Sequence, residues 1–334
     1  MLSTEEAKKI GLRACIDKLG YSFCKKYEET TVYGYREEDG LVECYVGIDN
    51  RQNDNDKKSS PLFLDDTKMS PYYARCSVSR ADGTITFLEE HIPMNWTKHY
   101  KKAVTFSYDD GVTPDVKLLE IFNKYGIKCT FNLNYGLGPT NGGWEYMGKP
   151  VNRLDLAENV EKYAGHEIAA HALTHPDLTK LPLEEARREM AEDKEGLTKL
   201  FGKSPVGMAY PFGTFNDEVV NMRDELGFQY ARTVWSSHNF DVQTDLLRFR
   251  PTCHHDDEKL FELAEEFLAM ETDEPKIFYV WGHSYEFEGN ENWDRIEKLC
   301  QMLSGRDDIF YGTNEEVLLY GTINIQSIFK FEYK

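Results

Sequence analysis

The spacing of apolar and polar residues changes near residue 100 and divides the chain into two regions. In the first region, apolar residues over 2–19 recur at helical spacing, and Ser3 with Glu6 is typical of a capping box at a helix start. Short runs in which apolar and polar residues alternate follow, and they predict strands. These runs lie at 31–35, 41–48, 72–78 and 84–88. We therefore expect a small α+β module, one helix plus a strand meander, over residues 1–95.

From residue 102 onward, short apolar runs alternate with loops and longer amphipathic runs. The short runs predict strands at 103–108, 128–133, 167–170, 206–210, 230–234 and 276–281. The longer runs predict helices at 114–125, 182–200, 217–226 and 293–303. Alternating strands and helices favour a parallel sheet that is closed, or nearly closed, into a barrel. We expect this α/β barrel over residues 100–334, with its chemistry at the C-terminal ends of the strands.

The composition excludes several classes of protein. The 334 residues include 39 Lys and Arg against 58 Asp and Glu, which gives a net charge of −19. This balance disfavours binding to nucleic-acid phosphates and to anionic membrane surfaces. The mean hydropathy is −0.59, and no run reaches the about 18 apolar residues that a membrane helix needs, so we expect no membrane span.

The cysteines indicate a reducing compartment. They are odd in number, scattered, and free of any Cys-x-x-Cys spacing, which is typical of free thiols. They are Cys15, Cys24, Cys44, Cys76, Cys129, Cys253 and Cys300. The first residues also lack a basic flank followed by an apolar run, so we expect a cytoplasmic protein. An extracellular location stays open if a longer precursor exists.

Two adjacent carboxylates, Asp109 and Asp110, end the first strand of the second region and precede Gly111. Their repulsion is costly unless a cation relieves it, and neighbouring residues of a strand point in opposite directions. This pattern predicts divided roles, in which one carboxylate binds a metal and the other acts as a base. The alternative is an Asp-Gly turn with solvated charges.

His171 and His175 follow a later strand and are spaced four residues apart. On a helical turn, two such histidines face the same way and can chelate one ion. Asp110 with both histidines leaves an open position on a divalent metal, as a hydrolytic site requires. The alternative is a pair of structural histidines.

Two further strand ends offer groups for catalysis. The turn over 210–213 exposes backbone N–H groups that can face an oxyanion. His283 emerges from the apolar strand over 276–281, a place that suits a general acid. A generic turn and a core histidine are the respective alternatives.

Taken in order, these segments resemble the polysaccharide deacetylases, also called NodB-homology proteins or carbohydrate esterase family 4, over roughly residues 100–320. The resemblance implies Asp109 as the base and Asp110, His171 and His175 as metal ligands. It further implies that the Phe212 backbone N–H meets the oxyanion and that His283 is the catalytic histidine. The implied activity is metal-dependent removal of N- or O-linked acetyl groups from a carbohydrate. The metal is a divalent ion, with zinc the first choice and Co²⁺, Ni²⁺ or Mn²⁺ as alternatives.

The sequence departs from the family pattern at several positions. Ala209 stands where the family has an arginine that orients the catalytic aspartate, and Ala172 stands where a Ser or Thr is usual. No fourth motif with adjacent Asp and Trp is found. We expect Arg248 or Arg250 to replace the missing arginine and to approach Asp109. Arg232 is a third candidate and is less well placed in sequence.

Aromatic residues near the strand ends are candidates for stacking on a sugar ring, with loop packing as the alternative. We expect substrate contacts from Tyr210, Trp235 and Tyr285. Further candidates are Trp144, Tyr146 and Phe287.

Two other polar features are weaker candidates for a functional role. His254, His255 and the two aspartates after them invite a metal interpretation, which we disfavour because adjacent side chains point in different directions. Glu286, close after His283, is a weak candidate for setting the pKa of that histidine.

Two other functions remain open from the sequence. A related metal-dependent amidase could act on a small amide or cyclic imide, and a non-catalytic carbohydrate-binding protein could use the same scaffold. The retention of Asp109 and His283 argues against the second. The sequence predicts neither the oligomeric state nor the role of the N-terminal module.

Overall fold

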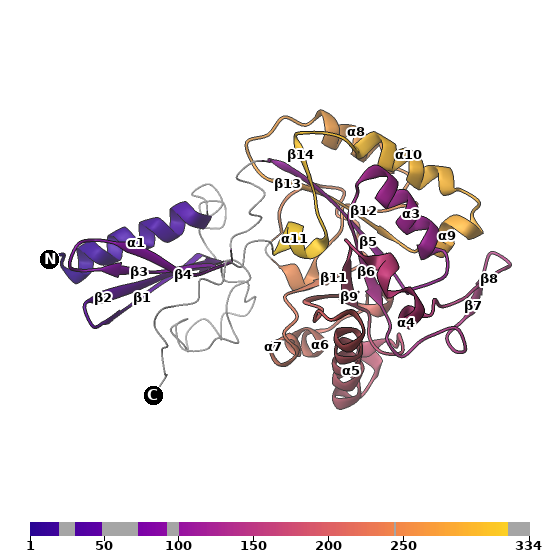
Figure 1. Ribbon diagram of the computed structural model, residues 1–334, viewed down its shortest axis with the longest axis horizontal. Coiled ribbons are helices and arrows are strands. Elements are labelled where there is room, and N and C mark those ends of the chain that lie inside the picture. The colour runs from indigo at the N-terminus through magenta and orange to yellow at the C-terminus, as the bar shows by residue number, and fades with distance from the viewer. Residues whose placement is uncertain (20–30, 49–72, 92–99, 244, 320–334) are drawn as a thin grey trace. The chain divides into compact units, whose positions relative to one another are not determined.

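The computed structural model describes residues 1–19, 31–48, 73–91, 100–243 and 245–319. The chain divides into two compact units, one formed by Met1–Asn95 with Leu319–Lys334 and the other by Trp96–Leu318 (Figure 1). That the two units are independent domains stays a prediction. No helix within the described ranges is long and apolar enough to cross a membrane.

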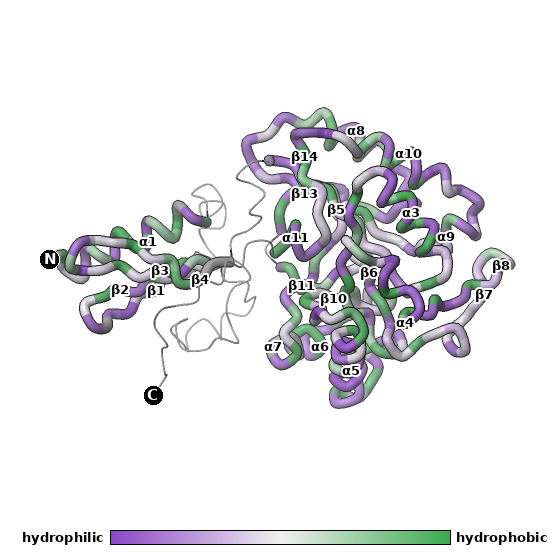
Figure 2. The backbone as a smooth tube through the Cα atoms, viewed as in Figure 1, coloured by the Kyte–Doolittle hydropathy of each residue, from purple (hydrophilic) through white to green (hydrophobic). Residues whose placement is uncertain are grey.

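The first unit has one helix packed on an antiparallel sheet. Its elements are α1 (Thr4–Leu19), β1 (Thr31–Glu38), β2 (Leu41–Ile48), β3 (Tyr73–Ser79) and β4 (Ile85–His91), with sheet order β1-β2-β3-β4. The capping box is present, because the Ser3 backbone N–H donates to Glu6 at 2.8 Å. The helix alternates apolar and polar turns along its length (Figure 2) and packs on β2 and β3. Cys15, Cys44 and Cys76 are buried between helix and sheet as free thiols.

The second unit is built on a curled parallel sheet. Its strands are β5 (Lys102–Asp109), β6 (Cys129–Leu133), β9 (Glu167–Ala170), β10 (Gly207–Ala209), β11 (Tyr230–Arg232), β12 (Cys253–His254), β13 (Lys276–Gly282) and β14 (Ile309–Tyr311). They follow the order β11-β10-β9-β6-β5-β13-β12, and β14 also pairs with the first residues of β5. Every residue of β5 is buried, as expected for a strand covered on both faces.

The sheet closes through a segment that the sequence pattern did not single out. Phe249 bridges Arg232 in parallel, so the chain just before β12 pairs with β11. Three residues later, the Thr252 N–H donates to the Tyr279 carbonyl of β13 at 2.8 Å. The predicted barrel is therefore confirmed, and this short segment joins its two edges.

Helices cover the outside of the barrel (Figure 1). The longer ones are α3 (Asp115–Tyr125), α5 (Leu183–Phe201), α8 (Leu260–Ala269) and α10 (Trp293–Leu303). The shorter ones are α4 (Leu156–Asn159), α6 (Asp217–Asn221), α7 (Arg223–Leu226), α9 (Ser284–Gly289) and α11 (Asn314–Leu318). Each of α3 and α5 ends at a glycine in the left-handed region, Gly126 (φ 65°) and Gly202 (φ 74°). Buried residues of α10 recur at helical spacing from Ile296 to Leu303, which fixes the face that meets the core.

A small hairpin is inserted between β6 and β9. It consists of β7 (Trp144–Tyr146) and β8 (Lys149–Val151), paired antiparallel. We did not predict these strands, because three residues are too few to show an alternation of apolar and polar positions. The residues that follow it reach the site described next.

Candidate active site

A cavity of about 670 Å³ opens at the C-terminal ends of the barrel strands. It brings together side chains from the ends of β5, β9, β10 and β13, the four segments singled out in the sequence. Its lining includes Asp109, Asp110, Trp144, His171, His175, Tyr210, Phe212, His283 and Tyr285, all of them expected, and also Arg153, Gly213, Val234 and Trp281. The placement at strand ends agrees with the general rule for such barrels.

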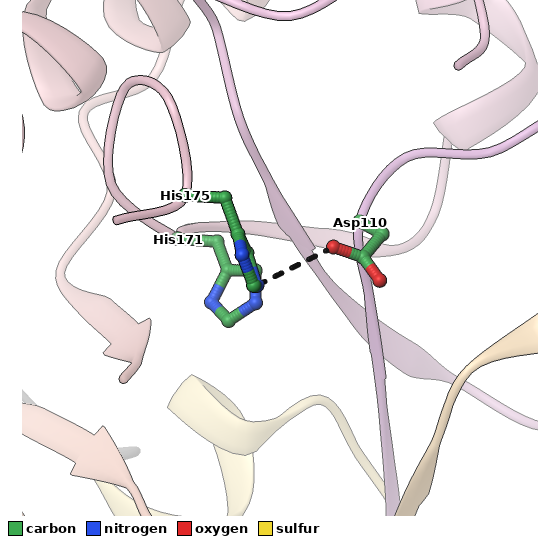
Figure 3. Close-up of side chains that lie close together, drawn as sticks. All are labelled: Asp110, His171 and His175. Atoms are coloured by element: carbon green, nitrogen blue, oxygen red, sulfur yellow. Dashed lines mark ion pairs between the residues drawn. The ribbon is translucent and has the colours of Figure 1, made fainter. Parts of the chain in front are cut away.

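Asp110, His171 and His175 form a compact set of possible metal ligands. One ligand atom from each lies within 4.8 Å of the others. His175 Nε2 is 3.6 Å from Asp110 Oδ1, and the two imidazole rings lie side by side facing the carboxylate (Figure 3). His171 Nδ1 is 2.7 Å from the Ala209 carbonyl, which sets the tautomer that leaves Nε2 free as a ligand.

The charge state of the two histidines also suits metal binding. Burial lowers the pKa of His171 to about 4 and lowers the pKa of His175, so both imidazoles are neutral near pH 7. Neutral imidazole nitrogens and one carboxylate oxygen are ligands that zinc and related divalent ions accept. The residues present therefore fit a divalent metal with an open coordination position.

The spacing of the two histidines led us to expect a helical turn, but the structure has none there. They occupy a loop in which Ala172 (φ 62°) and His175 (φ 58°) have left-handed backbone conformations. The backbone N–H of His171 donates to Asp193 of α5 at 2.9 Å, which anchors the start of the loop. The two rings therefore come together because the loop adopts a strained backbone, and not because they share one face of a helix.

Asp109 is a buried carboxylate with a partner on each oxygen. Asn132 of β6 donates to Oδ1 at 2.8 Å, and Arg232 of β11 donates to Oδ2. Burial by itself raises the pKa of Asp109, but the Arg232 guanidinium and the imidazoles of His171 and His283 outweigh it and lower the pKa to about 2. Asp109 is therefore held as an anion, the state that a general base requires.

Our prediction that Arg248 or Arg250 orients Asp109 is wrong, because Arg232 does so. In the parallel pairing of β10 with β11, Ala209 stands directly opposite Arg232. The arginine missing at position 209 is thus supplied at the same level by the neighbouring strand. The small Ala209 side chain leaves room beside it.

Arg248 and Arg250 have other partners. Arg248, at the end of a short 3₁₀ helix, pairs with Asp217 at 2.6 Å and Asp245 at 3.2 Å. The Arg250 guanidinium lies 5.6 Å from the centre of the Trp235 ring. Phe249, which stands between them, is level with Arg232, but both guanidinium groups point to these other partners.

His283 is placed at the start of α9, with Glu286 one turn later. Its Nδ1 is 3.2 Å from Glu286 Oε2, and its Nε2 is 3.8 Å from Asp109 Oδ2. Burial alone lowers the pKa of His283, but the Glu286 carboxylate, helped by both aspartates, raises it to about 9. His283 therefore carries a proton at neutral pH, as a general acid must.

Glu286 is a stronger partner than the sequence indicated. His254 Nε2 and His255 Nε2 lie 3.1 and 3.2 Å from the same carboxylate oxygen, so these adjacent residues do face one group. Together the imidazoles hold the pKa of Glu286 well below its usual range in spite of burial. His254 with His283 and Glu286 also lies close enough to hold a metal, but the carboxylate already has three imidazole partners there.

Phe212 sits where the oxyanion group was expected. It lies in the turn Pro211–Gly213, has a left-handed backbone (φ 58°), and packs edge-on against His175 with ring centres 4.7 Å apart. Its side chain is 62% exposed. A bulky residue in this conformation is costly, and such strain is concentrated at functional sites.

The expected aromatic contacts divide into three groups. Tyr210 and Tyr285 line the cavity, and Trp144 does so from the hairpin. Trp235 instead lines an adjoining hollow of about 440 Å³. Phe287 is fully buried and belongs to the core, so it cannot stack on a substrate.

Arg153 lines the cavity and was missed from the sequence. It is buried beside Asp110, to which it donates hydrogen bonds. The two adjacent carboxylates are thus relieved by two guanidinium groups, Arg232 for Asp109 and Arg153 for Asp110. Their repulsion is therefore no argument for a metal, and that argument rests on the Asp110–His171–His175 set alone. The sequence around Arg153 carries no pattern that singles it out.

Fold and site together define a (β/α) barrel with an Asp-His-His set at its strand ends. Residues 97–231 match the family model described as polysaccharide deacetylase. The resemblance seen in the sequence is confirmed over these residues of the barrel, which are similar to the polysaccharide deacetylases.

Two curated relatives illustrate the similarity. The peptidoglycan-N-acetylglucosamine deacetylase of Bacillus cereus is 25% identical over 171 residues, covering 45% of this chain and 53% of the relative. The chitin deacetylase of a Pestalotiopsis species is 28% identical over 159 residues, covering 47% and 45%. The chain thus spans about half the length of these relatives. The solved family 4 carbohydrate esterase of Streptomyces lividans has a TM-score of 0.42 at 16% identity, over 63% of this chain and 91% of that one.

Proposed function

We propose that the protein is a metal-dependent deacetylase that removes acetyl groups from a carbohydrate. The observation that carries the proposal is the arrangement of one ionised and one protonated group around the ligand set. Asp109 and His283 lie 3.8 Å apart, and both line the cavity into which Asp110, His171 and His175 face. The names of the relatives, which act on chitin and on peptidoglycan, support an acetylated amino sugar as the substrate.

Asp110, His171 and His175 would hold the metal, for which we propose zinc. A bound divalent ion polarises the acetyl carbonyl and lowers the pKa of the attacking water. Asp109 accepts the proton that this water loses as it adds to the carbonyl carbon. The backbone N–H of Phe212 would donate to the oxygen that gains negative charge.

His283 completes the reaction as the acid. It donates its proton to the leaving nitrogen or oxygen when the bond from that atom to the acetyl carbon breaks. Acetate and a free amine or hydroxyl are the products, and the proton taken by Asp109 balances the one given by His283. Glu286 and the Arg232–Asp109 pair keep the two groups in opposite protonation states.

The two alternatives from the sequence lose support. The amidase relied partly on a missing arginine, whose place Arg232 takes. The non-catalytic binder has no need for an ionised Asp109 beside a protonated His283.

Acetate release from acetylated chito-oligosaccharides tests the proposal, with zinc content measured on the same sample. We expect stoichiometric zinc and acetate release in the wild type, and loss of both in His175→Ala. His238→Ala is the matched control, because this half-exposed histidine pairs with Asp257 away from the ligand set. Zinc binding without acetate release from any acetylated saccharide would overturn the proposal, as would full activity in His175→Ala.

A further inference from the structure

We propose that Arg153 and Asn134 form a hydrogen-bonded bridge that sets the spacing between the two halves of the Asp-His-His ligand set. The inference rests on the proposed metal site and assigns positioning roles to two residues outside the family motifs. Neither residue is a ligand, and both act through the ligands that they hold.

The bridge runs from the aspartate to the histidine loop without a gap. Arg153 Nη1 donates to the Asp110 backbone carbonyl, to Asp110 Oδ1 at 3.2 Å and to Asn134 Oδ1 at 2.9 Å. Asn134 Nδ2 then donates to the carbonyls of His171 and Ala172, each at 2.6 Å. Every residue of the bridge is buried.

The sheet topology explains why such a bridge is needed. Asp110 follows β5 and His171 follows β9, but β6 lies between these strands in the sheet. No backbone pairing therefore joins the two ligand segments directly. Asn134, which follows β6, occupies the middle position and links both sides.

Both ligand segments also have backbone conformations that need support. Asp110 (φ 85°) and Ala172 (φ 62°) are non-glycine residues in the left-handed region, which L side chains adopt only at a cost. The bridge bonds to the carbonyl oxygens of these same two residues. It is thus attached where the ligand segments are least able to hold their own shape.

Arg153 is itself fixed from two directions. The residues around it pair with the loop after Asp110, since the Leu154 N–H donates to the Gly111 carbonyl at 2.9 Å. On the other side, the Trp144 ring of the hairpin lies 4.8 Å from the guanidinium carbon. A guanidinium held in this way can act as a rigid spacer.

The charge of Arg153 and its position have opposite consequences for metal affinity. As a nearby positive charge alone, Arg153 repels a divalent cation, so its removal would tighten binding. As a spacer, it preorganises the ligands, so its removal weakens binding. Partners of this kind that orient ligands typically change metal affinity about 10- to 100-fold.

Zinc affinity, measured by competition with a chromophoric chelator on the metal-free protein, separates these roles. We expect Arg153→Gln, Arg153→Lys and Asn134→Ala each to weaken zinc binding roughly 10- to 100-fold. The lysine variant keeps the charge but loses the planar fork. The double variant Arg153→Gln/Asn134→Ala should bind no more weakly than the worse single variant, because the bridge is broken only once. Arg187→Gln, which removes a surface pair with Glu225, is the control and should leave the affinity unchanged.

The Co²⁺-loaded protein gives a second readout, because the visible spectrum of the ion reports the geometry of its ligands. We expect the spectrum to change in the Arg153 and Asn134 variants and not in the control. Unchanged zinc affinity in folded Arg153→Gln and Asn134→Ala would overturn the inference. Tighter binding in Arg153→Gln with no change in Arg153→Lys would also overturn it, since charge alone would then act. A wild type that binds no zinc would instead refute the proposed metal site.

Discussion

At the scale of single residues, two adjacent aspartates are kept apart in role by different partners. Asp109 is bound by Arg232 and Asn132, and Asp110 by Arg153. Each guanidinium offsets one buried negative charge, and for Asp109 burial raises the pKa but Arg232 and the nearby imidazoles outweigh it. Asp109 is thereby kept as a base, and Asp110 is held facing the two histidines.

The role of Arg232 in orienting Asp109 can be tested by moving the arginine from β11 to the neighbouring strand β10. We expect Arg232→Ala to lower turnover roughly 10- to 100-fold, because Asp109 loses the partner that orients it. It should also cost about 3–5 kcal/mol of stability, since a buried charge is left unpaired. The double variant Arg232→Ala/Ala209→Arg should regain part of both losses, because residues 209 and 232 are register partners. Turnover and thermal midpoint are the measurements, and a double variant no better than Arg232→Ala would refute the replacement.

The Glu286–His283 pair predicts a pH effect with a definite sign. Burial favours neutral His283, and Glu286 opposes this and raises the pKa of His283 to about 9. Glu286→Gln removes the carboxylate, so the pKa falls and the acid form is lost at a lower pH than in the wild type. We expect the basic limb of the kcat/KM profile to move to lower pH.

A neighbouring glutamate supplies the control for this experiment. Glu288→Gln changes an exposed carboxylate that accepts a hydrogen bond from Trp293, and it should leave the limb in place. A basic limb that does not move in Glu286→Gln would mean that His283 is not the acid.

At the scale of elements, the barrel strands were predictable because burial on both faces makes them continuous apolar runs. The 103–108 run became β5 and the 276–281 run became β13 with small changes at the ends. The hairpin β7–β8 and the two-residue strand β12 were not predicted, because two or three residues are too few to show the alternation of apolar and polar residues. Arg232 was only the third candidate for another reason, since strand register depends on contacts that no single segment contains.

The site was predictable to a similar extent. Motif order pointed to Asp109, Asp110, His171, His175 and His283, and the structure brings these five to one cavity. Of the residues that hold them, Arg232 and Glu286 were only weaker candidates and Arg153 was missed, because buried polar partners have no local pattern. Their side chains are identified only once packing is known.

Glu167 of β9 provides a test at this scale, because it ties several elements together. It accepts hydrogen bonds from Thr130 of β6 and Tyr230 of β11, both at 2.7 Å, and from the Glu315 N–H of α11 at 2.8 Å. Burial raises the pKa of Glu167 to about 7 in spite of these donors. The folded state therefore binds its proton more tightly than the unfolded state does.

The sign of the pH effect on stability follows from this raised pKa. Stability from Glu167 is fully present below the unfolded pKa and falls as pH rises toward about 7, where the folded protein gives up the proton. Glu167→Gln cannot ionise, so its thermal midpoint relative to the wild type should rise between about pH 5 and about pH 8. Glu195→Gln on the surface of α5 is the control. An equal difference at both pH values would refute the prediction.

At the scale of the whole molecule, the site residues all belong to one unit. The ligand set, its bridge and the acid–base pair come from the barrel, which has an apolar core. The two aspartates are already paired with arginines without a metal. The folded barrel should therefore not depend on metal for its integrity.

Removal of metal by a chelator tests this expectation. We expect acetate release to be lost and the thermal midpoint to change only slightly, with full recovery of activity when zinc is returned. Circular dichroism and calorimetry before and after dialysis are the measurements. Unfolding or aggregation on dialysis would show that the ion is a structural element, contrary to the arrangement of Arg153 and Arg232.

The pairing of both aspartates with guanidinium groups has a consequence for the protein in a cell. On the proposed function, a chain whose site is electrically balanced before the metal binds would fold and persist at any level of that ion. Its amount is then set by synthesis, while the active fraction is set by the free concentration of the ion relative to its dissociation constant. Such a protein forms a standing reserve that a rise in metal supply converts into activity without new translation.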